Sequence, residues 1–99
     1  MIHLEPEYLN IVKAILKNRV PDRAVWVFGS RITPHYKAHS DIDLCILGDE
    51  PLTLTVLAQL REDFSESDLP MRVDLVDWAS TTPDFRALIL AHHYPFISI

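Results

Sequence analysis

Residues 28–44, FGSRITPHYKAHSDIDL, contain the pattern from which the architecture of the chain is most readily predicted. Gly29 and Ser30 follow a run of β-branched and aromatic residues, and ten residues later Asp41 and Asp43 stand inside a second apolar run. Side chains two apart in a strand point to the same face, so these carboxylates project together and the apolar residues beside them project to the other face. The pattern predicts two strands, joined by a loop or short helix, with a pair of carboxylates on one side of the sheet.

The flanking segments extend this pattern into alternating helices and strands. Apolar residues at helical spacing, bounded by prolines, predict three helices: from Pro6 to the break at Pro21-Asp22, from Pro51 to the break at Leu69-Pro70, and from Pro83 after its cap Thr82. Runs of β-branched and aromatic residues predict three strands: AVWVF at 24–28, DIDLCIL at 41–47 and RVDLVDW at 72–78. We expect Phe85, Leu88 and Ile89 to face inward, and the apolar tail at 92–99 either to complete the sheet or to cover a partner. This order predicts one layered α/β domain over residues 1–99.

The composition limits the class of protein. A chain of 99 residues supports one domain with a modest core, and no run of about 18 apolar residues could span a membrane. The net charge of −5, with scattered Lys and Arg, argues against a protein that holds nucleic acid by neutralising its backbone. The single cysteine, Cys45, allows neither an internal disulfide nor a thiolate cluster for zinc, and we interpret it as a small buried hydrophobe. We therefore expect a cytoplasmic protein without a membrane or direct nucleic-acid partner.

A third carboxylate, Asp74, lies in the later strand at 72–78. If that strand pairs with the one at 41–47, Asp74 converges with Asp41 and Asp43, because adjacent strands lie about 4.8 Å apart. Three like charges on a partly buried face raise each other's pKa unless a cation neutralises them, and hard oxygen ligands suit Mg²⁺ or Mn²⁺. Two such ions would activate an attacking oxygen and stabilise a leaving pyrophosphate, which is the chemistry of phosphoryl or nucleotidyl transfer.

Gly29, Ser30 and Arg31 suit the phosphates of such a substrate. A phosphate can approach the Gly29 backbone because no Cβ is present, Ser30 can cap the next segment and offer its hydroxyl, and Arg31 adds a planar cation. Other sites fit poorly, since an EF-hand loop from Asp41 would need glycine where Ile46 stands, and the GxxxxGK[ST], GxGxxG and GxSxG patterns do not occur. The remaining alternative is structural: a strand edge with two exposed aspartates.

Four features together resemble the DNA polymerase β nucleotidyltransferase superfamily: Gly29-Ser30, the ten residues that follow, Asp41-x-Asp43, and Asp74 within RVDLVD. The likeness covers nearly the whole chain and is closest to the minimal nucleotidyltransferases, which occur as partners of HEPN-domain proteins. It implies a nucleotidyltransferase fold, a small mixed sheet flanked by helices, with the three aspartates as metal-binding catalytic residues and the Gly-Ser pair at the triphosphate. One departure is visible, because many relatives place a glycine where this chain has ITP at 32–34.

The resemblance also implies a reaction and a partner. The reaction is Mg²⁺-dependent transfer of a nucleoside monophosphate, AMP from ATP, to a hydroxyl of a partner protein or of a substrate that the partner presents. Asp41 and Asp43 would hold both metals, and Asp74 would complete one of them and serve as, or assist, the general base. The partner would be a small helical HEPN protein, a toxin that this chain neutralises as the antitoxin of a hetero-oligomer. The alternative is a non-catalytic subunit that neutralises or scaffolds the HEPN partner by contact.

The remaining polar and aromatic residues receive structural interpretations. We expect exposed loop positions for His39 and Ser40, surface or interface positions for His92 and His93, a strand-end or capping role for Asp77, and core positions for Trp26, Phe28 and Trp78. None of these residues is assigned to catalysis.

Overall fold

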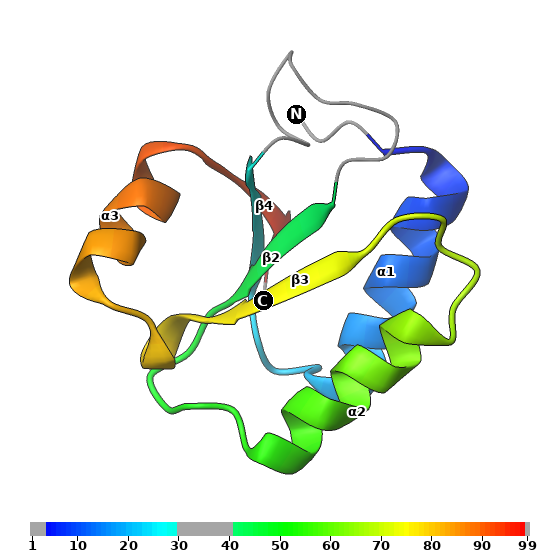
Figure 1. The fold of residues 1–99 in the computed structure, drawn as a ribbon, viewed down its shortest axis with the longest axis horizontal. Helices are drawn as coiled ribbons and strands as arrows, with labels where there is room; N and C mark the ends of the chain where they lie inside the picture. The colour runs from blue at the N-terminus through cyan, green and yellow to red at the C-terminus, as the bar shows by residue number, and fades with distance from the viewer. Residues whose placement is uncertain (1–3, 30–40, 99) are drawn as a thin grey trace.

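The computed structural model describes residues 4–29 and 41–98 and has, within these ranges, a four-stranded sheet between two helical layers (Figure 1). The elements occur in this order: α1 (Pro6–Arg19), β1 (Val25–Phe28), β2 (Ile42–Ile46), α2 (Leu54–Ser65), β3 (Val73–Asp77), a short 3-10 helix (Trp78–Ser80), α3 (Pro83–Ala91) and β4 (His93–Ile97). Helices α1 and α2 cover one face of the sheet, and α3 lies on the other face. The predicted fold class, a small mixed sheet flanked by helices, is confirmed.

Local chemistry determines where the helices begin. α1 begins at Pro6, whose fixed φ suits the first helical turn and whose missing N–H is not needed there. α2 and α3 each follow a threonine cap: Thr53 Oγ1 accepts the N–H of Val56 at 3.1 Å, and Thr82 Oγ1 accepts the N–H of Phe85 at 3.2 Å. The predicted start of α3 is confirmed, whereas α2 begins later than its preceding proline had indicated. No helix in the described ranges has both the length and the apolar character needed to cross a membrane.

The strands form a mixed sheet in the order β3-β2-β1-β4. β1 is antiparallel to both β2 and β4, whereas β2 is parallel to β3. β4 is formed by the apolar tail, and its Phe96 and Ile97 pack against the core. The first of the two alternatives for this tail is therefore confirmed, because it completes the sheet as an edge strand.

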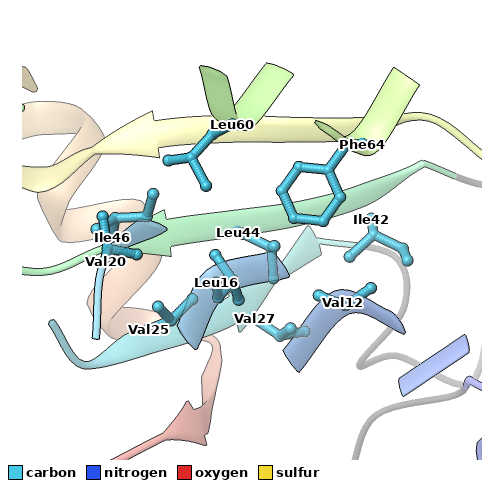
Figure 2. Close-up of a cluster of buried hydrophobic side chains, with 10 residues drawn as sticks. All are labelled: Val12, Leu16, Val20, Val25, Val27, Ile42, Leu44, Ile46, Leu60 and Phe64. Atoms are coloured by element: carbon cyan, nitrogen blue, oxygen red, sulfur yellow. The ribbon is translucent and has the colours of Figure 1, made fainter. Parts of the chain in front are cut away.

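The hydrophobic core lies between the sheet and the layer of α1 and α2. Its buried members come from both helices, from β1 and β2, and from the residue after α1 (Figure 2): Val12, Leu16, Val20, Val25, Val27, Ile42, Leu44, Ile46, Leu60 and Phe64. Alternate residues of β1 and β2 thus point toward α1 and α2, as the period of a strand requires. The residues between them, including Phe28, Asp43 and Cys45, point toward the α3 face.

The inward face predicted for α3 is wrong in part. Ile89 is buried, as expected, but Leu88 is 69% exposed and Phe85 is 38% exposed. α3 packs on the sheet with the side that bears Ile89 and Arg86, and the Arg86 guanidinium lies 4.8 Å from the ring centre of Trp78. Successive residues are about 100° apart around a helix, so a helix that touches the sheet along the Ile89 side turns Leu88 toward solvent.

Candidate active site

Two carboxylates lie side by side on the α3 face of the sheet. Asp43 of β2 and Asp74 of β3 are direct partners in the parallel register, and Phe28 of β1 is the partner of Asp43 on its other side. Asp41 lies immediately ahead of β2 and is half-buried. The strand pairing on which the sequence prediction depended is therefore present, and it brings the three aspartates to one end of the sheet.

The surroundings of Asp43 disfavour its negative charge. Burial has the largest effect, and together with the charges of Asp74 and Asp41 it raises the pKa of Asp43 from 3.8 to about 6. At neutral pH Asp43 is still mostly ionised, so the site holds repelling negative charges close together. A bound cation would relieve this repulsion.

Gly29 ends β1 directly against Asp43. Its φ is +78°, a conformation that residues with a Cβ rarely adopt, and a Cβ added there would collide with the Asp43 carboxylate. Gly29 is thus required by both backbone geometry and space, because its backbone lies directly against the Asp43 carboxylate. Ser30 and Arg31, predicted to bind phosphate with Gly29, lie outside the described residues, as do His39 and Ser40.

Asp74 has a neighbour that the sequence analysis did not single out. Arg72 lies two positions earlier, on the same face of the strand, and its guanidinium is 3.3 Å from Asp74 Oδ1. The Arg72 side chain is 80% exposed, so this ion pair is screened by water and easily exchanged for another partner. The two-residue spacing in RVDLVD was the signal that could have identified it.

The donor set fits a hard divalent cation better than a soft one. Carboxylate oxygens suit Mg²⁺ or Mn²⁺, and such ions are commonly held by one or two carboxylates together with substrate phosphates and water. Within residues 4–29 and 41–98, no three Asp, Glu, His or Cys side chains are already arranged as a metal site. That Asp41, Asp43 and Asp74 together bind metal therefore stays a prediction.

An aromatic cluster borders the carboxylates on the α3 face and comprises Trp26, Phe28, Trp78, Phe85 and His93. The Phe28 and Phe85 rings meet edge to face at 6.0 Å, and the Trp26 and Trp78 rings do so at 5.6 Å. His93, expected at a surface or interface, is instead stacked on Trp26 at 4.1 Å, with Nδ1 3.2 Å from the Ile89 carbonyl oxygen. Its place in β4 follows from pairing with β1, which the sequence analysis left as one of two alternatives. The cluster forms an apolar wall beside the acidic site.

Two other reactive groups near β2 and β3 have structural roles. Asp77 is the last residue of β3, which confirms the strand-end alternative of its prediction, and its side chain does not cap the 3-10 helix that follows. Its Oδ2 instead accepts the N–H of Leu52 at 2.9 Å and the hydroxyl of Ser80 at 3.0 Å. Cys45 is fully buried, and burial, with a smaller contribution from Asp77, raises the pKa of its thiol to about 11. A protonated buried thiol is a poor nucleophile, in agreement with the interpretation of Cys45 as a small hydrophobe.

A groove between α1 and α2 lies away from the carboxylates. It has a volume of about 560 Å³ and is lined by Ile11, Ile15, Asp63 and their neighbours on the two helices. The groove lies on the opposite side of the sheet from Asp43, and Asp63 at its edge is already paired with Arg19 at 2.7 Å. The candidate active site is therefore identified by the clustered carboxylates of Asp41, Asp43 and Asp74, and not by the volume of the groove.

Comparison with known proteins gives consistent results. A family model described as "Polymerase beta, Nucleotidyltransferase" matches residues 10–98. The chain is 52% identical over 88 residues to the "Probable protein adenylyltransferase MntA" of Haemophilus influenzae, an alignment that covers 89% of this chain and 77% of that protein.

Two solved structures have a similar fold. A "putative minimal nucleotidyltransferase" is 31% identical with a TM-score of 0.68, covering 94% of this chain and 97% of that one. A chain from the complex of a tri-AMPylated Shewanella oneidensis HEPN toxin with an MNT antitoxin has a TM-score of 0.73 at 21% identity, covering 97% of this chain and 74% of that one. The second likeness concerns the fold alone.

Proposed function

The chain belongs to the polymerase β nucleotidyltransferase family, and we propose that it transfers AMP from ATP to a hydroxyl group of a HEPN-type partner protein. Nucleotidyl transfer is the activity of the family. The observation that carries the proposal is the pairing of Asp43 with Asp74 on one face of the sheet, beside Gly29. The name of the 52% identical relative, a protein adenylyltransferase, supports AMP as the transferred group and a protein as the acceptor.

The carboxylates act as metal ligands in this proposal. Asp41 and Asp43 would hold Mg²⁺, and Asp74 would complete one site. The metal would neutralise the triphosphate, make the attacking hydroxyl more acidic and stabilise the pyrophosphate that leaves as AMP is transferred. We also assign Asp74 to accept the proton of that hydroxyl, because its side chain is 43% exposed and its ion pair with the exposed Arg72 is weak. Rotation away from Arg72 would release Asp74 Oδ1 for either role.

The phosphate groups lie along the end of β1. Gly29 carries no Cβ, so its backbone lies directly against the Asp43 carboxylate, and we assign a triphosphate oxygen to the same backbone on the strength of the motif. We assign Ser30 and Arg31 to the same triphosphate on the strength of the motif, with Ser30 as a hydrogen-bond donor and Arg31 as a counter-charge. The apolar wall at Phe28 excludes water from one side of the reacting groups.

The biological role we propose is that of the antitoxin in a HEPN and nucleotidyltransferase pair. The fold it shares with a chain of the complex between an AMPylated HEPN toxin and an MNT antitoxin supports this role. Under this proposal the chain inactivates its partner by adding AMP to it, and the two proteins form a hetero-oligomer.

Intact mass spectrometry of the partner tests the proposed reaction. The tagged chain is purified with its HEPN-type partner and incubated with ATP and Mg²⁺, alongside the Asp41→Asn/Asp43→Asn variant. Wild type is expected to add AMP to the partner, and the variant to be slower by at least about 100-fold, because metal stabilisation is worth several kcal/mol and each 1.4 kcal/mol is tenfold in rate. Asp49→Asn, an exposed acid in the loop after β2, is the matched control. Equal transfer by the double variant would refute the site assignment.

A second function, neutralisation by contact alone, is favoured by one observation. α3 exposes Leu88 and Leu90, which a permanent partner could cover. The two functions separate cleanly, because a contact inhibitor would still neutralise its partner when Asp41 and Asp43 are both Asn. A transferase with the same substitutions would bind the partner and leave it active.

A further inference from the structure

α3 is apolar on its outward side. Of its nine residues only Ile89 is buried, whereas Leu88 is 69% exposed, Leu90 is 52% exposed, and both alanines are exposed. We call Ala87, Leu88, Leu90 and Ala91 the α3 outer face, because helical spacing places them away from Ile89. Among the described residues, this is where large exposed apolar side chains gather on a single helix.

The two charged residues of α3, Asp84 and Arg86, do not make its outward side polar. Arg86 donates from Nε and a terminal nitrogen to the Trp78 carbonyl oxygen, at 3.2 and 2.7 Å, and lies over the Trp78 ring. Asp84, the other charged residue of α3, is exposed and makes no ion pair or cation-π contact with the residues that the structure describes. By contrast, α1 and α2 expose charged residues on their outer sides. A helix whose outward side bears apolar residues, as well as the side packed on the sheet, is normally covered in the working form of a protein.

The α3 outer face is continuous with the carboxylate site. Phe85, in the first turn of α3, is 38% exposed and its ring contacts Phe28 at 6.0 Å. Phe28 is the register partner of Asp43 on the neighbouring strand. Leu88 lies three residues after Phe85 and therefore on the same flank of the helix. An apolar path thus leads from the rim of the site at Phe28, through Phe85, to Leu88.

We infer that the α3 outer face is the docking surface for the acceptor protein, which binds there through an uncharged apolar surface of its own. The inference rests on the proposed function and adds the place where the acceptor sits. The reaction requires an acceptor hydroxyl beside Asp43 and Asp74, and a protein seated on α3 lies against the wall of that site. A nucleotide is too polar to cover an outward helix face of this kind.

The composition of the face also defines how the acceptor is held. The four residues of the α3 outer face carry no charge, so the face offers little electrostatic attraction and apolar contact provides the affinity. The affinity is therefore expected to change less than about threefold between 0.05 and 0.5 M NaCl, whereas charge-driven docking would weaken strongly over that range. This separates docking on α3 from docking on the acidic surfaces elsewhere on the chain.

Paired substitutions on exposed leucines test the docking surface. Leu88→Lys/Leu90→Lys places two charges on the α3 outer face, near the end of the helix where positive charge is tolerated, so the fold should survive and circular dichroism checks it. Leu54→Lys is the matched control, because Leu54 is 85% exposed at the start of α2, on the other side of the sheet. The HEPN-type protein that co-purifies with wild type is produced separately, and its affinity for each variant is measured by calorimetry. AMP transfer and binding of Mg²⁺-ATP are measured in parallel.

The double variant is expected to bind the partner at least about 10-fold more weakly than wild type and to lose transfer in proportion, with unchanged binding of Mg²⁺-ATP. Leu54→Lys should match wild type in every assay. Equal partner affinity of wild type and the double variant would overturn the inference, and so would light scattering that shows a wild-type dimer broken by the substitutions with partner affinity unchanged. If wild type transfers no AMP but the double variant still loses partner binding, the proposed activity fails and the docking surface stands.

Discussion

Replacing Asp43 with Asn tests the electrostatics of the site without any substrate. Folding raises the pKa of Asp43 from 3.8 to about 6, a difference of about 2. At about 1.4 kcal/mol for each pKa unit, the ionised Asp43 carboxylate lowers the free energy of unfolding by at most about 3 kcal/mol. Asp43 is only half-buried, and water and salt screen part of this cost, so the expected value is about 1–2 kcal/mol. Asn has nearly the same shape and no charge, so the variant should be more stable than wild type by this amount at pH 7.5.

The effect has a defined dependence on pH. A group whose pKa is raised by folding stabilises the folded state fully below its unfolded pKa, here 3.8, and this contribution is lost as the pH rises through about 6. Wild type and Asp43→Asn should therefore have nearly equal free energies of unfolding at pH 4. The advantage of the variant should appear between pH 4 and 7 and remain constant above that range.

Urea unfolding followed by tryptophan fluorescence, in buffers with EDTA, measures this difference at several pH values. Asp49→Asn is the control for removing one negative charge from a protein of net charge −5, and it should not show the same pH-dependent gain. Added Mg²⁺ should stabilise wild type more than Asp43→Asn. The electrostatic reasoning would be refuted by a variant that is less stable than wild type at pH 7.5, or by a gain that is the same at pH 4.

Three further substitutions or treatments have defined outcomes. Gly29→Ala should abolish transfer in the intact-mass assay and lower stability by about 1–3 kcal/mol, because a Cβ at φ +78° meets the Asp43 carboxylate. Asp77→Ala should lower stability by about 1–3 kcal/mol, since it leaves the N–H of Leu52 without its acceptor, while transfer by the folded protein persists; an unchanged urea midpoint would contradict this. Cys45 should resist alkylation at pH 8 until the protein unfolds, because its pKa is raised to about 11, and rapid labelling of native protein would contradict its burial.

The sequence predicted the features that depend on local chemistry or on strand period. The cap at Thr82 and the strands around Trp26, Asp43 and Asp74 follow from turn residues, β-branched runs and alternation, and the structure contains all of them. The pairing of β2 with β3 was stated only as a condition, because a single sequence shows which residues share a face but not which strands are neighbours. That pairing places Asp43 beside Asp74.

Features that depend on contacts between distant segments were less predictable. Leu88 was assigned inward because helical spacing groups it with Phe85 and Ile89, but the side of α3 that meets the sheet is set by where Trp78 and Arg86 pack. His93 acquires its place on Trp26 only because β4 pairs with β1. In both cases the determining contact lies outside the window over which periodicity can be measured.

The two faces of the sheet carry opposite contributions to stability. Ile42 and Leu44 point toward α1 and α2 and are fully buried there, whereas Asp43 between them points toward α3 and costs stability at neutral pH. Residues of β2 alternate between the two faces of the sheet, so the apolar side chains and the Asp43 carboxylate lie on opposite sides. The charge of Asp43 can therefore lower the stability of the folded state without disturbing the packing of the core. The side of the sheet that bears Asp43 is also the side covered by α3, and α3 exposes apolar surface at Leu88 and Leu90. Under our proposals, a cation with nucleotide would neutralise the charge at the carboxylates, and a partner would cover the apolar surface of α3. Ligands that bind only the folded state stabilise it. With Mg²⁺-ATP and partner added to both proteins, wild type should therefore be more stable than Asp43→Asn, even though Asp43→Asn is the more stable of the two without ligands.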